Sequence, residues 1–192
     1  EILLFLISSL ALTLMPGPDI LFVVNQSLEK RKNGIITSLG LCTGLIFHTM
    51  FLVFGLSALI ESNKSLITFL KYFGTIYLFY LAYIEIKSEN KINKSLNSKL
   101  FLRGLYMNLI NPKVLIFFIA YFPNFLFSDT IKISNQFLLL GFVFIFQAFL
   151  VFVSVSLIAN KLIKYTSIDS NNKMLKYFKS LIFIIIGLLI LI

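Results

Sequence analysis

Long apolar runs alternate with short polar stretches along the whole chain. Two parts of it, residues 33–60 and 133–160, each hold 28 consecutive residues without Asp, Glu, Lys or Arg. A helix needs about 20 apolar residues to cross a hydrocarbon core ~30 Å thick. The pattern therefore predicts an all-α, polytopic membrane protein with about six transmembrane segments in a single membrane domain over residues 1–192. The segments are Ile2–Val24, Ile35–Ile60, Leu66–Ile86, Phe101–Phe127, Gln136–Asn160 and Met174–Ile192.

Composition supports this class and excludes others. Hydrophobic residues make up 58% of the chain, and only 25 of its 192 residues are charged, 17 Lys or Arg and 8 Asp or Glu. Soluble domains carry about 25% charged residues, so a soluble enzyme and a disordered chain are excluded. A membrane β-barrel is disfavoured because its strands are short runs of alternating hydrophobicity. The basic residues behind the net charge of +9 lie mainly between the apolar segments, so we expect a lipid bilayer and no nucleic acid as partner.

The basic residues also predict how the chain is oriented. The five connections, counted with the beginnings of the segments that follow, carry 3, 2, 5, 1 and 5 Lys or Arg residues in chain order. The positive-inside rule then places the first, third and fifth connections in the cytoplasm and both termini on the outer side. Differences in loop length alone are the alternative explanation of this alternation.

A faint internal repeat relates the two halves of the chain. Pro18 and Asp19 precede four apolar residues in segment one, and Pro112 and Lys113 precede four apolar residues in segment four. Each pair lies in the first of three segments, and an odd number of segments gives the two halves opposite orientations. We therefore predict two inverted three-segment repeats, over about residues 1–86 and 101–192, with the first segment of each broken at Pro. The Lys-, Asn- and Ser-rich stretch 87–100 is predicted to be a solvated linker.

Segment one carries a helix break followed by an acid. Pro16, Gly17 and Pro18 remove or weaken helix hydrogen bonds. Unpaired backbone groups at membrane depth are tolerated where they line a cavity or find other partners. Asp19 begins the helix that resumes, where bare N–H groups and the positive dipole end stabilise an anion, either this carboxylate or that of a substrate. We predict Gly17, Pro18 and Asp19 to be substrate-binding residues. The alternative is a kink near the membrane surface with Asp19 as an exposed cap.

Segment four carries the counterpart, formed by Asn108, Asn111, Pro112 and Lys113. Asn111 precedes a proline and is therefore pushed away from helical geometry, and asparagine side chains cap broken helix ends. A buried ammonium costs roughly 2.5–3.5 kcal/mol unless it is paired or hydrated. We predict that these four residues bind substrate, and that Lys113 meets Asp19 near the midplane as an ion pair or as the two poles of a site for a zwitterion. The alternative is that Lys113 snorkels to an interface.

His48 is the only histidine and lies well inside segment two. Its unperturbed pKa of about 6.5 makes it, with Asp19, a candidate for proton coupling. The alternative is a hydrogen-bonding residue between helices. Gln147 falls in the matching part of segment five and is a candidate polar partner across the repeats, whereas Gly40 and Gly44 suit close helix packing.

The residues of an enzyme or a channel are missing from the sequence. It has no phosphate-binding Gly-rich loop, no metal-ligand cluster and no Ser-His-Asp set, so we expect no catalytic residue, cofactor or metal. A channel would show rings of polar residues along one segment. A non-transporting membrane scaffold would tolerate replacement of Asp19 and Lys113.

Several blocks of residues follow one another in a particular order. They are Leu14–Asp19, Gln26–Leu28 with Arg31–Ile35, Leu39–Gly44 with His48, Leu70–Leu78, Phe101–Gly104 with Asn108, and Asn111–Lys113 with Phe117 and Phe118. In this order the blocks resemble the LysE/RhtB family of bacterial amino-acid exporters. The resemblance implies a multi-pass carrier of the bacterial cytoplasmic membrane that exports amino acids or close derivatives, and family members are thought to use the proton gradient. Some members carry an acidic residue at the position of Leu45, so its absence here favours a neutral substrate.

Together these observations favour a secondary-active, proton-coupled exporter that works by alternating access around the broken segments one and four. Asp19, Lys113 and the freed backbone groups would hold the zwitterion, and Asp19 or His48 would exchange the proton. Its partners would be the amino acid, the proton and the bilayer, with a homo-oligomer left open. A channel or a non-transporting scaffold is the alternative.

Overall fold

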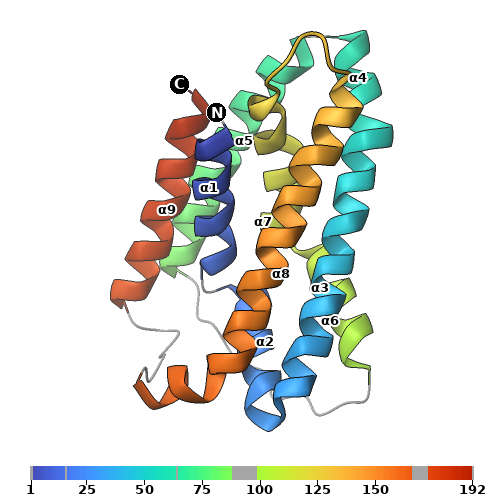
Figure 1. Cartoon of the computed structure of the whole chain (residues 1–192). Coiled ribbons are helices and arrows are strands. Elements are labelled where there is room, and N and C mark those ends of the chain that lie inside the picture. The colour runs from blue at the N-terminus through green and yellow to red at the C-terminus, as the bar shows by residue number, and fades with distance from the viewer. Residues whose placement is uncertain (1, 16, 64, 88–98, 166–172, 192) are drawn as a thin grey trace.

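The computed structural model describes residues 2–15, 17–63, 65–87, 99–165 and 173–191 (Figure 1). All regular structure in these residues is helical, which confirms the all-α prediction. Most of the predicted linker 87–100 and Pro16 lie outside the described residues. The elements are α1 (Ile2–Leu14), α2 (Pro18–Glu29), α3 (Arg31–Phe51), η1 (Leu52–Leu56), α4 (Ser57–Ser62), α5 (Ser65–Lys87), α6 (Leu100–Ile110), α7 (Pro112–Ile116), η2 (Phe117–Tyr121), η3 (Phe122–Phe125), α8 (Ile133–Tyr165) and α9 (Lys173–Leu191).

The long helices have the length and hydropathy needed to cross a membrane. Three continuous helical stretches of the described residues do so, namely Arg31–Ser62, which joins α3, η1 and α4, then Ser65–Lys87, and the part of α8 over 133–159. Two bent pairs pass the same test as broken spans, α1 with α2 at 55° and α6 with the helices over 112–125 at 52°. The described part of the chain is therefore a polytopic helical membrane protein. Several helices extend beyond the predicted apolar segments, because helical hydrogen bonding continues into their polar ends.

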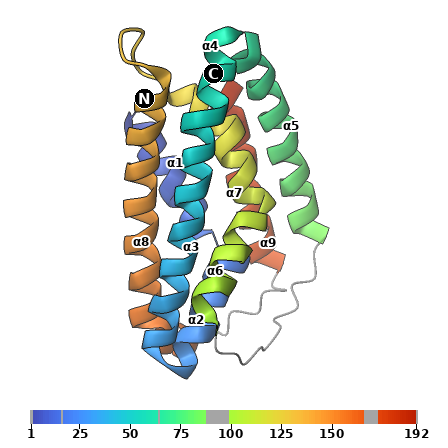
Figure 2. The same cartoon turned by 90° about the vertical axis from the view of Figure 1, so that its right-hand side faces the viewer.

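The bent pairs lie between two pairs of longer helices (Figures 1 and 2). On one side α5 packs along α9, while α9 also contacts α1, and α5 contacts α7 and η2. On the other side α3 packs against α6 and α8, and α8 contacts both α1 and α2. The two helix breaks are therefore enclosed by long helices.

The connections are sorted between the two ends of the bundle. The α4–α5 turn, the η3–α8 connection and both described chain ends lie at one end, at the top of Figure 1. The α2–α3 turn, the end of α5 and the beginnings of α6 and α9 lie at the other end (Figures 1 and 2). Lys30, Arg31, Lys32 and Lys99 belong to this second end, which is the one that the charge count assigns to the cytoplasm.

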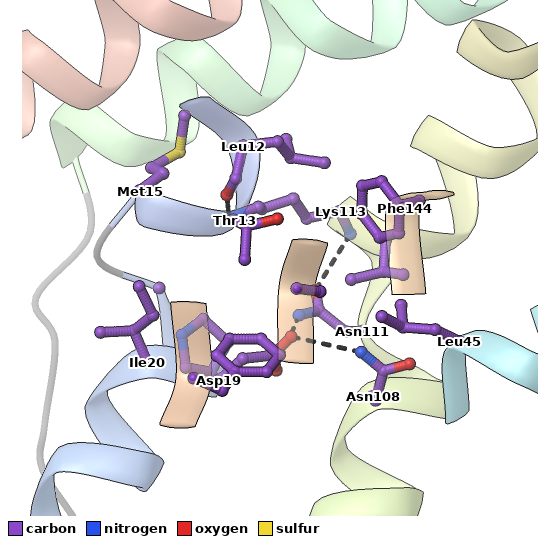
Figure 3. A pocket seen from close by; sticks show the side chains of 15 residues that line it. Leu12, Thr13, Met15, Asp19, Ile20, Leu45, Asn108, Asn111, Lys113 and Phe144 are labelled. Carbon is purple, nitrogen blue, oxygen red and sulfur yellow. Dashed lines mark hydrogen bonds between the residues drawn. The ribbon is translucent and has the colours of Figure 1, made fainter. Parts of the chain in front are cut away.

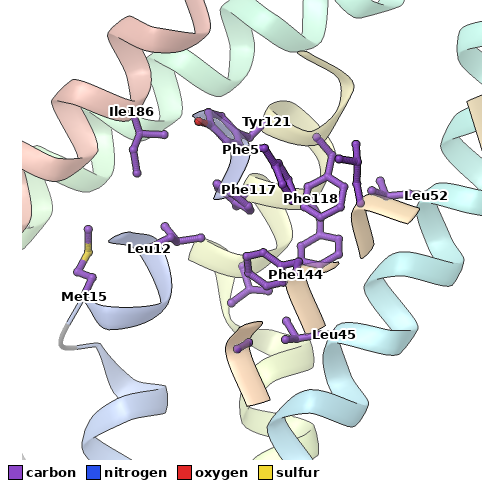
Figure 4. Close-up of a cluster of buried hydrophobic side chains, with 14 of the residues drawn as sticks. Phe5, Leu12, Met15, Leu45, Leu52, Phe117, Phe118, Tyr121, Phe144 and Ile186 are labelled. Carbon is purple, nitrogen blue, oxygen red and sulfur yellow. The ribbon is translucent and has the colours of Figure 1, made fainter. Parts of the chain in front are cut away.

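An aromatic core holds η2 between α1 and α8 (Figure 4). The rings of Phe118 and Phe122 stack at 4.3 Å between centroids, and Phe118 meets Phe144 of α8 edge-on at 5.2 Å. Phe5 of α1 meets Phe122 edge-on at 5.2 Å. Such pairs add about 0.5–1.5 kcal/mol each to the burial of the rings, so the core keeps segment four in register with α1 and α8 just beyond its break.

Close contact between α3 and α6 depends on glycine. A Cβ atom on Gly40 would collide with the Phe101 carbonyl oxygen, and one on Gly104 would lie 2.5 Å from the Thr37 carbonyl oxygen. The two helices therefore touch backbone to backbone, as small residues allow in membranes.

Candidate functional site

The first helix break brings Asp19 to the beginning of α2. Gly17, the residue before α2, is extended with φ −121° and ψ −173°, and Pro18 is the first helical residue, where its missing N–H leaves no hydrogen bond unmade. Asp19 lies in the first turn, where a negative side chain is stabilised by the helix dipole. The Asp19 side chain is buried, with 9% of its surface exposed.

The second break follows α6 and has a capped helix beginning. Asn111 is extended, with φ −67° and ψ 107°, as expected for a residue that precedes a proline. Its Oδ1 accepts a hydrogen bond of 3.1 Å from the backbone N–H of Lys113. Asn111 is therefore the N-cap of α7, in agreement with the sequence prediction.

Hydrogen bonds join the two breaks directly (Figure 3). Asn111 Nδ2 donates to Asp19 Oδ1 at 3.1 Å, and Asn108 Nδ2 donates to Asp19 Oδ2 at 3.4 Å. In the same direction, from segment four to segment one, Lys113 Nζ donates to the carbonyl oxygen of Leu12 at 2.8 Å. That carbonyl belongs to the last turn of α1, where a cation is favoured. Each break is thus stabilised by polar groups from the other.

These groups line a small cavity. Of the predicted site residues, Gly17, Pro18, Asp19, Asn108, Asn111 and Lys113 line it. The space that the centre of a water molecule can occupy is about 20 Å³, which suits a water molecule and is too small for an amino acid. Pro112 lies between two lining residues without lining the cavity itself. Most of the predicted binding residues therefore meet at one place, in a closed conformation.

Asp19 and Lys113 both line this cavity. No ion pair within 4.0 Å joins them, although the Lys113 ammonium interacts electrostatically with Asp19. The sequence predicted either a direct ion pair between Asp19 and Lys113 or two separate charges on one site, and the structure does not contain the direct ion pair. The alternatives of an exposed Asp19 cap and a snorkelling Lys113 do not fit the hydrogen bonds described above.

His48 lies behind the cavity rather than on it. Its Nε2 is 3.3 Å from the carbonyl oxygen of Asn108, near the end of α6, and the side chain is buried. On the opposite half, Gln147 of α8 donates from Nε2 to the Leu6 carbonyl of α1 at 3.0 Å and accepts from Ser9 Oγ at 2.9 Å. His48 and Gln147 do not bond to each other. Each instead bonds to the broken segment of the other half.

A buried ion pair was not anticipated from the sequence. Lys179 of α9 donates to Glu85 of α5 at 2.8 Å, and the Lys179 side chain is 1% exposed. Both charges also interact with Lys113. Lys179 is one of the five basic residues counted with the fifth connection, although both it and Glu85 lie inside predicted apolar segments, and a scan for charges inside all six segments would identify the pair. Among the described residues, no group of three or more His, Cys, Asp and Glu side chains could hold a metal ion.

Apolar helices that enclose two facing helix breaks, with a few charged and amide side chains in the cavity between them, have the architecture of a membrane carrier. Comparison with known proteins agrees with this class. The family model described as LysE type translocator matches residues 10–192. The chain belongs to this family, which confirms the resemblance found in the sequence.

Curated relatives align over nearly the full length. The homoserine/homoserine lactone efflux protein of Salmonella typhimurium is 26% identical over 193 residues, covering 97% of this chain and 93% of the relative. The protein of the same description from Salmonella typhi is 28% identical, with the same coverage of both chains. The uncharacterized membrane protein YrhP of Bacillus subtilis is 27% identical and covers 91% of this chain and 89% of its own. No solved structure gives a significant match.

Proposed function

We propose that this translocator is a secondary-active exporter of neutral amino acids or close derivatives in a bacterial cytoplasmic membrane. Two bacterial relatives are homoserine/homoserine lactone efflux proteins, which supports export as the direction of transport. The observation that carries the proposal is that two residues of opposite charge, Asp19 and Lys113, line one cavity without forming an ion pair within 4.0 Å.

The two poles suit the two charged groups of an amino acid. The Asp19 carboxylate accepts from the substrate ammonium, and the Lys113 ammonium donates to the substrate carboxylate. Hydrogen bonds to charged groups contribute about 1.5–3 kcal/mol each. The Lys113 ammonium has three N–H donors and uses one of them for the Leu12 carbonyl, so it can also donate to the substrate carboxylate.

A neutral substrate follows from the charge balance of the cavity. Its lining includes one carboxylate and one ammonium, and Leu45 supplies an apolar surface at the position where some family members carry an acid. A zwitterion adds one charge of each sign and leaves the site neutral. A substrate with an additional cationic side chain would bury a charge without a partner, which is costly.

Transport requires the two breaks to separate. A space of about 20 Å³ admits no amino acid, so we propose alternating access by movement of the broken segments against each other. The reciprocal bonds of His48 and Gln147 to the opposite half support the proposed inverted repeat. Asp19 is the first candidate to exchange the coupling proton because it lines the cavity. His48, placed behind Asn108, is the second.

Uptake of labelled L-homoserine by everted vesicles under an imposed proton gradient tests this function. We expect uptake by the wild type and loss of uptake in Asp19→Asn and Lys113→Gln, with all proteins present in the membrane at equal amounts. Asp129→Asn is the matched control, since Asp129 is exposed in the η3–α8 connection and lies outside the cavity. Full transport by Asp19→Asn would contradict the assignment.

A further inference from the structure

One face of α8 forms a continuous apolar wall of the cavity. Phe144, Ala148 and Phe152 all line it and are 3%, 1% and 4% exposed. Their spacing of four residues places them on the same side of the helix, and neighbours in this row are about 6 Å apart along the axis. Because α8 is unbroken and packs against both α1 and α2, this wall spans the first break.

Ala148 is the only small side chain in this row. Phe144 and Phe152 lie one helical turn before and after it, and both rings line the same cavity as Lys113. The Ala148 methyl group is much smaller than the ring at each end of the row, and we call this position of the wall the notch. The notch opens on the same cavity as both charged poles.

The geometry points to Ala148 as the residue that limits the length of the substrate side chain. This inference rests on the proposed function, since it requires the ammonium at Asp19 and the carboxylate at Lys113. The remaining substituent of the α-carbon then lies against α8 and enters the notch. A short aliphatic or hydroxyl-bearing side chain fits between the rings, whereas a longer one meets the backbone of α8.

The other apolar lining residues are less suited to this role. Leu45 and Val114 are branched and fill their own positions, and both are buried. Met15 and Ile20 belong to the broken segment, which must move during transport. Ala148 is therefore the position where a change of one or a few carbon atoms alters the available length without altering a polar contact.

A substrate series tests the inference in everted vesicles that carry wild type, Ala148→Leu or Ala148→Gly. The series is L-alanine, L-homoserine and L-norleucine, each measured as initial uptake under the same proton gradient. A methylene in a pocket changes selectivity about 10- to 200-fold. We expect the homoserine-to-alanine uptake ratio to fall at least about tenfold in Ala148→Leu, and the norleucine-to-alanine ratio to rise in Ala148→Gly.

Ala159→Leu is the matched control, because Ala159 is also in α8 and 1% exposed but does not line the cavity. It should leave both ratios unchanged. Unchanged ratios in the Ala148 variants, or an equal shift in Ala159→Leu, would overturn the inference while leaving export itself established. If Ala148→Leu fails to reach the membrane, the ratio in Ala148→Gly decides. Absence of wild-type uptake for the whole series would instead refute the proposed function.

Discussion

A methyl group added at Gly44 should impair transport more than it impairs folding. Gly44 of α3 faces Asn108, and an added Cβ would lie 2.5 Å from Asn108 Oδ1 and 2.8 Å from its Cβ. Ordinary contact begins at 3.4 Å, so the amide oxygen has to move by the difference, about 0.9 Å. Asn108 Nδ2 is already 3.4 Å from Asp19 Oδ2. A displacement of this size would remove that hydrogen bond and change the position of a cavity wall.

The expected magnitudes differ for stability and for transport. Overpacking of a buried site costs about 1–3 kcal/mol, while replacing glycine with alanine in a helix recovers ~1 kcal/mol. The net loss of stability in Gly44→Ala is therefore about 0–2 kcal/mol. A misplacement of about 1 Å at a functional site can lower a rate about 100-fold, so we expect a 10- to 100-fold loss of homoserine uptake.

Vesicle uptake and membrane abundance, measured on the same preparations, separate the two effects. Gly55→Ala is the control, because a Cβ there meets only the Phe51 ring, at 3.6 Å. It should keep wild-type uptake. Uptake by Gly44→Ala within twofold of wild type, at equal abundance, would refute the reasoning. An equal loss in Gly55→Ala would refute it as well.

Two further substitutions examine the polar groups around the cavity. Glu85→Gln should lower the free energy of unfolding by about 3–5 kcal/mol, because it leaves the buried Lys179 ammonium without its charged partner. Adding Lys179→Gln should raise the thermal midpoint of the protein in detergent part of the way back to wild type, and no recovery would argue against direct pairing. We expect His48→Gln to keep transport, because the glutamine amide can still donate a hydrogen bond to the Asn108 carbonyl. Transport by His48→Gln as low as that of His48→Leu would instead assign His48 to proton coupling.

The sequence predicted the features that depend on local chemistry. Charge-free runs of 28 residues identified membrane-crossing helices because a bilayer requires that length of apolar helix. Pro18 and Pro112 located the two breaks, since a proline acts on its own and the preceding residue. The capping role of Asn111 followed from the same local rule.

Features that depend on tertiary packing could not be derived in this way. Lys113 bonds to the carbonyl of Leu12, 101 residues away, because the breaks face each other in a particular register. The face of α8 that lines the cavity could not be predicted either. Because α8 is apolar around most of its circumference, the spacing of its apolar residues does not distinguish a cavity wall from a lipid-facing surface. A role for Ala148 in the site can be inferred only after the structure shows which residues surround it.

The central claim is that Asp19 and Lys113 hold opposite ends of one substrate. Homoserine lactone keeps the ammonium of homoserine and lacks its free carboxylate, so the two compounds differ at the end assigned to Lys113. Uptake of both by everted vesicles of wild type and Lys113→Gln is the most direct test. We expect Lys113→Gln to lose homoserine uptake at least about tenfold more than lactone uptake, whereas Asp19→Asn loses both. An equal loss of the two compounds in Lys113→Gln would contradict the claim.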